Sequence, residues 1–211
     1  MARRADHSRE ELYELALATA EEIVETDGFR GLTARNVADA IGYSPGTLYN
    51  VFTNLDDLII HLNGRTLDRL YDLVIRKKMT GKPQRDVKTL LRVYLKFLER
   101  HRDLWELMME FKLPDGQDLP KWYMKKVEKV LTVLEQALAP LFPKKSKRKR
   151  QETARILWAS LHGICTLASA GKLMVVTNQS IEAMANALVS NYLAGLKATA
   201  RKTKRKASSS A

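Results

Sequence analysis

Apolar residues recur along the chain at the spacing of an α-helix, and polar stretches rich in glycine and proline separate the periodic segments. The first segment begins at Ser8, which forms a capping-box pattern with Glu11, and ends at Gly28. Further helical segments are predicted at 33–42, from 44, at 54–79, 84–100, 102–113, 121–139, 151–170 and 180–198. No alternating run is long enough for a sheet, so the pattern predicts an all-α protein.

Two of these segments are short, about eight residues each, and the letters GYS join them. Thr33 is placed to cap the first, which ends at Gly42. Ser44 is placed to cap the second, with Pro45 at the first helical position, where its missing N–H costs nothing. Two short helices joined in this way are typical of a helix-turn-helix, whose second helix enters the major groove of DNA.

The second short helix carries small polar groups on the side that its apolar residues leave free. Gly46 has no side chain to hold the backbone away from DNA, while Thr47 and Asn50 can donate or accept hydrogen bonds. An ordinary helix corner with a solvated polar face would show the same spacing. The predicted DNA-contacting residues are Arg3, Arg4, Thr33, Arg35, Ser44, Pro45, Gly46, Thr47, Tyr49 and Asn50.

The net charge of +12 is unevenly distributed along the chain. Residues 1–70 hold seven Lys and Arg, all arginine, against twelve Asp and Glu, a net charge of −5. The other residues hold 29 basic and 12 acidic groups, a net charge of +17, concentrated in KKSKRKR at 144–150 and in the tail RKTKRKASSSA. The basic segment 144–150 is either a solvated loop or an extra phosphate-binding surface.

The composition narrows the class of protein. No run approaches the roughly 18 apolar residues of a membrane span, and the N-terminus lacks the apolar stretch of a signal peptide. We therefore expect a cytoplasmic protein with no membrane partner. A single cysteine, Cys165, excludes an internal disulfide framework and an all-cysteine metal site, and no cofactor is predicted.

Two groups of residues could form a site in the second half of the chain. His162 and Cys165 stand three apart on one helical face, which could begin a metal or nucleophile site, but no further ligand, base or orienting group has suitable spacing. We expect neither a metal site nor an enzyme. Methionine and tryptophan side chains could pack a core or line an adaptable apolar cavity. The candidate pocket residues are Trp105, Met108, Met109, Trp122, Trp158, His162 and Cys165.

The stretch GFRGLTARNVADAIGYSPGTLYNVFTNLDDLI, residues 28–59, resembles the DNA-binding domain of the TetR (tetracycline-repressor-like) family. The resemblance rests on Thr33, Gly42, the letters GTLY at 46–49, Phe52 and the acidic start of the helix after Asn54. The family pattern usually has a lysine where Leu55 stands. LWASLHGICTLA at 157–168 looks like the Trp-x-x-x-His-Gly signature of one branch of TetR C-terminal domains.

The resemblance implies an all-helical homodimer whose last two long helices form a four-helix interface, with a ligand cavity in the C-terminal domain. Independently, these two helices are rich in Ala, Ser and Gly, which allow close helix approach. We predict a DNA-binding domain at 1–53, a connecting helix at 54–82, a regulatory and dimerisation domain at 83–200 and a disordered basic tail at 201–211.

The predicted function is sequence-specific transcriptional regulation. The leading hypothesis is a repressor that a small, largely apolar effector releases from a palindromic double-stranded DNA operator. The alternative is an architectural, DNA-organising protein of the same fold that responds to no ligand.

Overall fold

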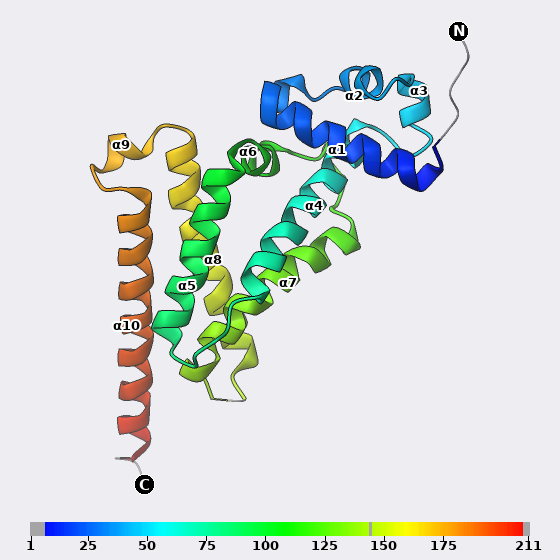
Figure 1. Cartoon of the computed structure of the whole chain (residues 1–211). Coiled ribbons are helices and arrows are strands. Elements are labelled where there is room, and N and C mark those ends of the chain that lie inside the picture. The colour runs from blue at the N-terminus through cyan, green and yellow to red at the C-terminus, as the bar shows by residue number, and fades with distance from the viewer. Residues whose placement is uncertain (1–6, 144, 209–211) are drawn as a thin grey trace. The chain divides into compact units, whose positions relative to one another are not determined.

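The computed structural model describes residues 7–143 and 145–208, and of residues 200–208 it describes the backbone alone. Every regular element in these ranges is helical, which confirms the all-α prediction (Figure 1). The elements are α1 Arg9–Asp27, η1 Phe29–Gly31, α2 Ala34–Ala40, α3 Pro45–Leu48, α4 Leu55–Ile75, α5 Pro83–Arg100, α6 Arg102–Glu110, α7 Lys121–Leu138, η2 Ala139–Leu141, α8 Lys147–Ser169, α9 Leu173–Val176 and α10 Ile181–Ser208, where η marks a 3₁₀ helix.

Helices α4 and α6 end a few residues before their predicted ends, and three further differences from the sequence prediction lie in the second half of the chain. Helix α8 begins at Lys147, inside the basic segment, although cations at a helix N-terminus oppose the helix dipole. Helix α9 forms within GKLMVVTNQ, which the pattern indicated as a connection. Helix α10 continues to Ser208 and includes 201–208, a segment predicted as part of a disordered tail.

The chain forms two compact units. The first unit contains residues 1–69 and 98–126, and the second contains 70–97 and 127–211. In the first unit α6 packs against α1 and η1 and adds Leu104 and Leu107 to the core that holds Leu17. Burial of apolar surface, rather than order along the chain, decides the division.

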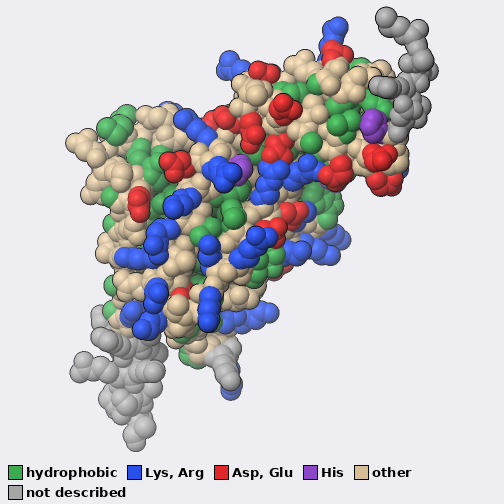
Figure 2. Space-filling view, viewed as in Figure 1, with side chains coloured by type: hydrophobic (Ala, Val, Ile, Leu, Met, Phe, Trp, Pro, Cys, Tyr) green, Lys and Arg blue, Asp and Glu red, His purple; other side chains and the backbone are tan. Residues whose placement is uncertain are grey.

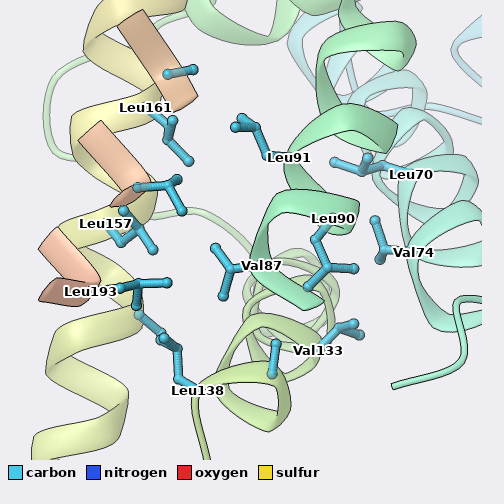
Figure 3. Close-up of a cluster of buried hydrophobic side chains, with 14 of the residues drawn as sticks. Leu70, Val74, Val87, Leu90, Leu91, Val133, Leu138, Leu157, Leu161 and Leu193 are labelled. Carbon is cyan, nitrogen blue, oxygen red and sulfur yellow. The ribbon is translucent and has the colours of Figure 1, made fainter. Parts of the chain in front are cut away.

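The core of the second unit lies between α4, α5, α7, α8 and α10. Leu91 and Val87 of α5 lie on the side of Leu157 and Leu161 of α8, while Leu90 lies near Val74 of α4 (Figure 3). Leu193 of α10 lies beside Leu157 (Figure 3). Leu157 and Leu193 are almost fully buried. The three-to-four-residue spacing of these leucines gives each helix one apolar stripe, which the neighbouring helices cover.

Candidate nucleic-acid interface and ligand cavity

Hydrogen bonds at the two caps fix the helix-turn-helix. The Thr33 hydroxyl accepts a bond from the backbone N–H of Asn36 at 3.0 Å, and Ser44 Oγ accepts one from the N–H of Thr47 at 3.2 Å. Gly42 lies between α2 and α3 with a φ of 76°, a conformation that side-chain-bearing residues rarely adopt. The sequence therefore specified both caps and the turn.

Helix α3 is shorter than expected, since it ends at Leu48 and a turn follows. In this turn the N–H of Asn50 donates to the carbonyl of Thr47 at 3.1 Å. Leu48 and Phe52 are nearly inaccessible to solvent, and the Phe52 ring stacks on Tyr13 of α1 with centroids 5.3 Å apart. The motif is thus held on α1 by its apolar side.

The opposite side of residues 44–50 is what we call the recognition face. Ser44, Gly46, Tyr49 and Asn50 are exposed there, and Tyr49 retains 45% of its accessible surface. Pro45 and Thr47 are half-buried, and the Thr47 hydroxyl lies 3.0 Å from Ser44 Oγ. The face offers the hydroxyls of Ser44 and Tyr49, the amide of Asn50 and bare backbone at Gly46, which suits contact with phosphates and base edges.

The other predicted DNA contacts lie outside residues 44–50. Thr33 and Arg35 are exposed at the start of α2, where Arg35 forms a solvent-exposed ion pair with Asp39 at 3.8 Å. Such an exposed pair contributes little to stability, so Arg35 remains available for a phosphate. Arg3 and Arg4 lie outside the described residues.

His7 and Tyr43 form a contact that sequence reasoning missed. His7 Nδ1 lies 2.7 Å from the Tyr43 hydroxyl, so the residue before the cap of α1 is joined to the turn between α2 and α3. The two residues are 36 positions apart, and no local pattern links them. The contact places His7 beside the turn that leads into the recognition face.

A polar and aromatic cluster surrounds His61 of α4. Its Nδ1 lies 2.9 Å from the Tyr13 hydroxyl, and its ring stacks on Trp122 at 4.6 Å. Burial lowers the pKa of His61, while Asp57 acts in the opposite direction. Gly64 also meets Trp122, since a Cβ atom there would lie 2.8 Å from the indole ring. The cluster fixes α4 against the first turn of α7.

An apolar cavity of about 60 Å³ lies in the second unit. Its lining comes from α4, α5, α7 and α8, and consists of Leu70, Val74, Val87, Leu90, Leu91, Tyr94, Val130, Leu131, Val133, Leu134, Trp158 and Leu161. It is smaller than an apolar cavity of about 150 Å³ that holds benzene, and it is partly open, so a larger ligand would extend beyond it or displace some of its lining. No lining residue carries a formal charge.

Trp158 is the member of the predicted pocket set that lines this cavity. His162 lies next to Trp158, with the two ring centroids 3.8 Å apart. The Nδ1 atom of His162 is 3.0 Å from the Tyr94 hydroxyl. Burial lowers the pKa of His162 to about 4 and raises that of Cys165 to about 11. At neutral pH His162 is therefore uncharged and Cys165 is a thiol, neither activated as an acid or a nucleophile.

The remaining four predicted pocket residues lie in the first unit. Trp105, Met108 and Met109 belong to α6, where Trp105 is buried, and Trp122 packs on α4 as described. Within residues 7–143 and 145–208, no three His, Cys, Asp or Glu side chains are grouped so that they could hold a metal ion. None of the described helices is long and apolar enough to cross a membrane.

Two family models match the chain. Residues 16–62 match the family described as bacterial regulatory proteins, tetR family, and residues 87–192 match the tetracyclin repressor-like C-terminal domain. The first match contains the helix-turn-helix, and the second contains Trp158 and His162. No curated protein matches the chain.

Solved structures share the fold at low identity. A protein of unknown function from Rhodococcus sp. RHA1 has a TM-score of 0.71 and 22% identity, covering 93% of this chain and 100% of that one. A TetR-family transcriptional regulator from Streptomyces coelicolor has a TM-score of 0.61 and 17% identity, covering 88% and 99%. Thermus thermophilus FadR, a TetR-family repressor in complex with lauroyl-CoA, has a TM-score of 0.61 and 19% identity, covering 87% and 92%. From the two family matches, the chain belongs to the TetR family of DNA-binding transcription regulators.

Proposed function

We propose that the protein is a homodimeric repressor that binds a palindromic operator through its recognition face and is released by an apolar small molecule. The apolar cavity carries this proposal. Leu70 and Val74 of α4 form part of its lining, and α4 is the helix that follows the motif directly in the chain. A ligand that enters this space and displaces Leu70 or Val74 would favour a different position of α4.

The uncharged lining indicates the class of effector. Apolar surface and a single tyrosine hydroxyl favour an aliphatic or aromatic molecule over an ion. The lauroyl chain bound by Thermus thermophilus FadR is of this kind, which supports acyl compounds as the first to test. His162, which is uncharged, lies beside the lining residues Tyr94 and Trp158 and adds no charge near the cavity.

The test combines operator selection with ligand binding. Selection from random duplexes should yield a palindrome whose half-sites are about one helical turn apart. Lauroyl-CoA and dodecanol should each be added to the complex while release and melting temperature are followed, because a ligand that binds the folded state raises its melting temperature by mass action. Coating of any duplex, with no thermal response to either compound, would instead support the architectural alternative.

Loss of the recognition-face groups should weaken operator binding. Tyr49→Phe and Asn50→Ala should each cost about 1–3 kcal/mol of specific binding free energy, because each removes a hydrogen-bonding group from an exposed position of the motif. Fluorescence anisotropy with the selected operator measures the change. Asn178→Ala, an equally small change at an exposed position of the second unit, is the control. Full operator affinity in both variants would remove the assignment of this face.

The proposed dimer interface consists of the outer sides of α8 and α10 with α9. Ile156 and Leu167 of α8 are exposed by 54% and 39%, and Val175 of α9 by 85%. A Cβ atom at Gly163 or Gly195 would meet nothing within 4 Å, so no neighbouring group within the chain requires a glycine at either position. A second copy would cover the apolar groups and use the close approach that glycine permits.

Charge introduced on this surface should therefore separate the dimer. We expect Ile156→Asp combined with Leu167→Asp to yield a monomer that keeps its helix content, because two carboxylates would be desolvated in the interface. Light scattering coupled to size exclusion measures the mass. Ile75→Asp, at a 42% exposed position of α4, is the matched control and should leave the mass unchanged. A double variant that remains dimeric contradicts the proposed interface.

A further inference from the structure

The two units differ sharply in charge. The first unit has 13 basic and 18 acidic residues, a net charge of −5, although it contains the helix-turn-helix. The second has 23 basic and 6 acidic residues, a net charge of +17. Lys and Arg side chains outnumber acidic ones over α5 and the lower part of the second unit in Figure 2. Attraction to a polyanion therefore resides mainly outside the motif.

Two basic segments lie at the same end of the second unit (Figure 1). The first, 76–85, includes the chain between α4 and α5, and the second, 145–150, leads into α8. Figure 1 shows both connections at the same end of the helices. We call this surface the basic end; its side chains are Arg76, Lys77, Lys78, Lys82, Arg85, Lys145, Lys147, Arg148, Lys149 and Arg150.

Acidic groups neutralise little of this charge. Arg148 pairs with Glu152 at 2.9 Å, and both side chains are largely exposed. The other nine basic side chains form no ion pair with any acidic residue that the structure describes. Asp86 is buried at the base of this surface, where it accepts bonds from the N–H and hydroxyl of Thr80. The positive charge thus faces solvent.

Helix α8 begins in an electrostatically unfavourable way. Its first turn holds four cations and no acidic residue, and Ser146 makes no capping bond through its side chain. The partial positive charge of a helix N-terminus adds to this repulsion. The Nε of Arg150 is enclosed without a hydrogen-bond acceptor among the described residues. Bound anions would relieve the repulsion among the exposed cations and complement the helix N-terminus.

We propose that the basic end is a second DNA-contacting surface, which binds the phosphate backbone of a duplex without reading its sequence. This inference rests on the proposed function for the identity of the polyanion. Exposed cations spread over two segments suit an extended polyanion better than a single small phosphate. Binding to a duplex would neutralise several of its phosphates and release several counterions at once. The two segments carry no exposed large apolar side chain of the kind that inserts into a membrane surface.

The test compares two variants with equal loss of charge in the same unit. The first carries K77Q, K78Q, K82Q and R85Q in the basic end; the control carries R92Q, K96Q, K129Q and K172Q, all exposed positions outside it. Binding to a duplex without the operator is measured by anisotropy over a range of salt concentrations. Each lost phosphate contact should reduce the slope of log K against log salt by about 0.9. We expect at least about a tenfold loss of affinity near 0.1 M salt for the first variant, and less than about threefold for the control.

Other outcomes would overturn the proposal. Equal losses in both variants would mean that only net charge acts, and binding of phosphatidylserine vesicles without duplex binding would mean that the surface meets lipid. A third variant, Y49F with N50A, separates this proposal from the proposed function. It should lose operator selectivity while it keeps the non-operator affinity that the basic end supplies. If no operator exists but the basic-end variant still loses duplex binding, the proposed function fails and this inference stands.

Discussion

Replacing Phe52 with alanine is expected to lower the free energy of unfolding of the first unit by about 3–5 kcal/mol. The Phe52 side chain is 1% exposed, and its ring lies against Tyr13 at 5.3 Å and His61 at 5.8 Å. Truncation removes this contact area and leaves a cavity where α1, α4 and the end of the motif meet. Operator binding should be lost at temperatures where the wild-type protein binds, because the recognition face depends on this packing.

Phe29→Ala provides the matched control for this prediction. Phe29 lies in the same unit and is 40% exposed, so the same truncation should cost less than about 1 kcal/mol. Chemical denaturation followed by circular dichroism and tryptophan fluorescence measures both variants. Equal destabilisation by the two changes would show that Phe52 is not an anchor of the motif.

Leu157→Ala is expected to destabilise the second unit by about 2–5 kcal/mol and to strengthen its binding of apolar ligands. Leu157 is completely buried in the core (Figure 3). Its neighbour Trp158, and Leu161 on the next turn of α8, line the cavity. The deleted atoms add space beside a cavity of about 60 Å³. A ligand that fills the added space recovers part of the lost stability by mass action.

Leu73→Ala is the control, because Leu73 is 40% exposed on α4 and lies in the same unit. Its effect on the free energy of unfolding should be below about 1 kcal/mol, with no change in ligand response. Thermal unfolding with and without dodecanol separates the two effects. A Leu157 variant that loses stability but gains no ligand-induced shift would show that the cavity does not accept apolar molecules.

Local signals explain why the DNA-binding motif could be predicted. The caps at Thr33 and Ser44, the left-handed residue Gly42 and the apolar pair Leu48 and Phe52 act over only a few positions, so each is visible in the sequence. Helix α3 is shorter than expected because, after Leu48, the N–H groups of Asn50 and Val51 donate to the carbonyl three residues back instead of four. Propensity and capping do not determine where such a change occurs.

The predicted pocket shows where the sequence becomes ambiguous. Tryptophan and methionine at helical spacing are equally suited to a core and to a cavity, and only contacts decide between them. Trp122 packs on Gly64 and His61 of α4, while Trp158 lines the cavity. The partners of Trp122 lie 58 or more positions away in the chain, and Trp158 shares the cavity with residues of α5. No local pattern in the sequence shows which of these partners each tryptophan will contact.

The sequence by itself determined the helical class, most helix boundaries, the helix-turn-helix and the uneven distribution of charge, because capping, periodicity and composition are local properties. The tertiary structure decided that α6 joins the core of the first unit, that His7 contacts Tyr43, and that four helices line an apolar cavity. It also brought the basic segments 76–85 and 145–150 to one end of the second unit (Figure 1). These features arise from burial of apolar surface between segments distant in the chain, and that burial is specified only by the packing of all the helices together.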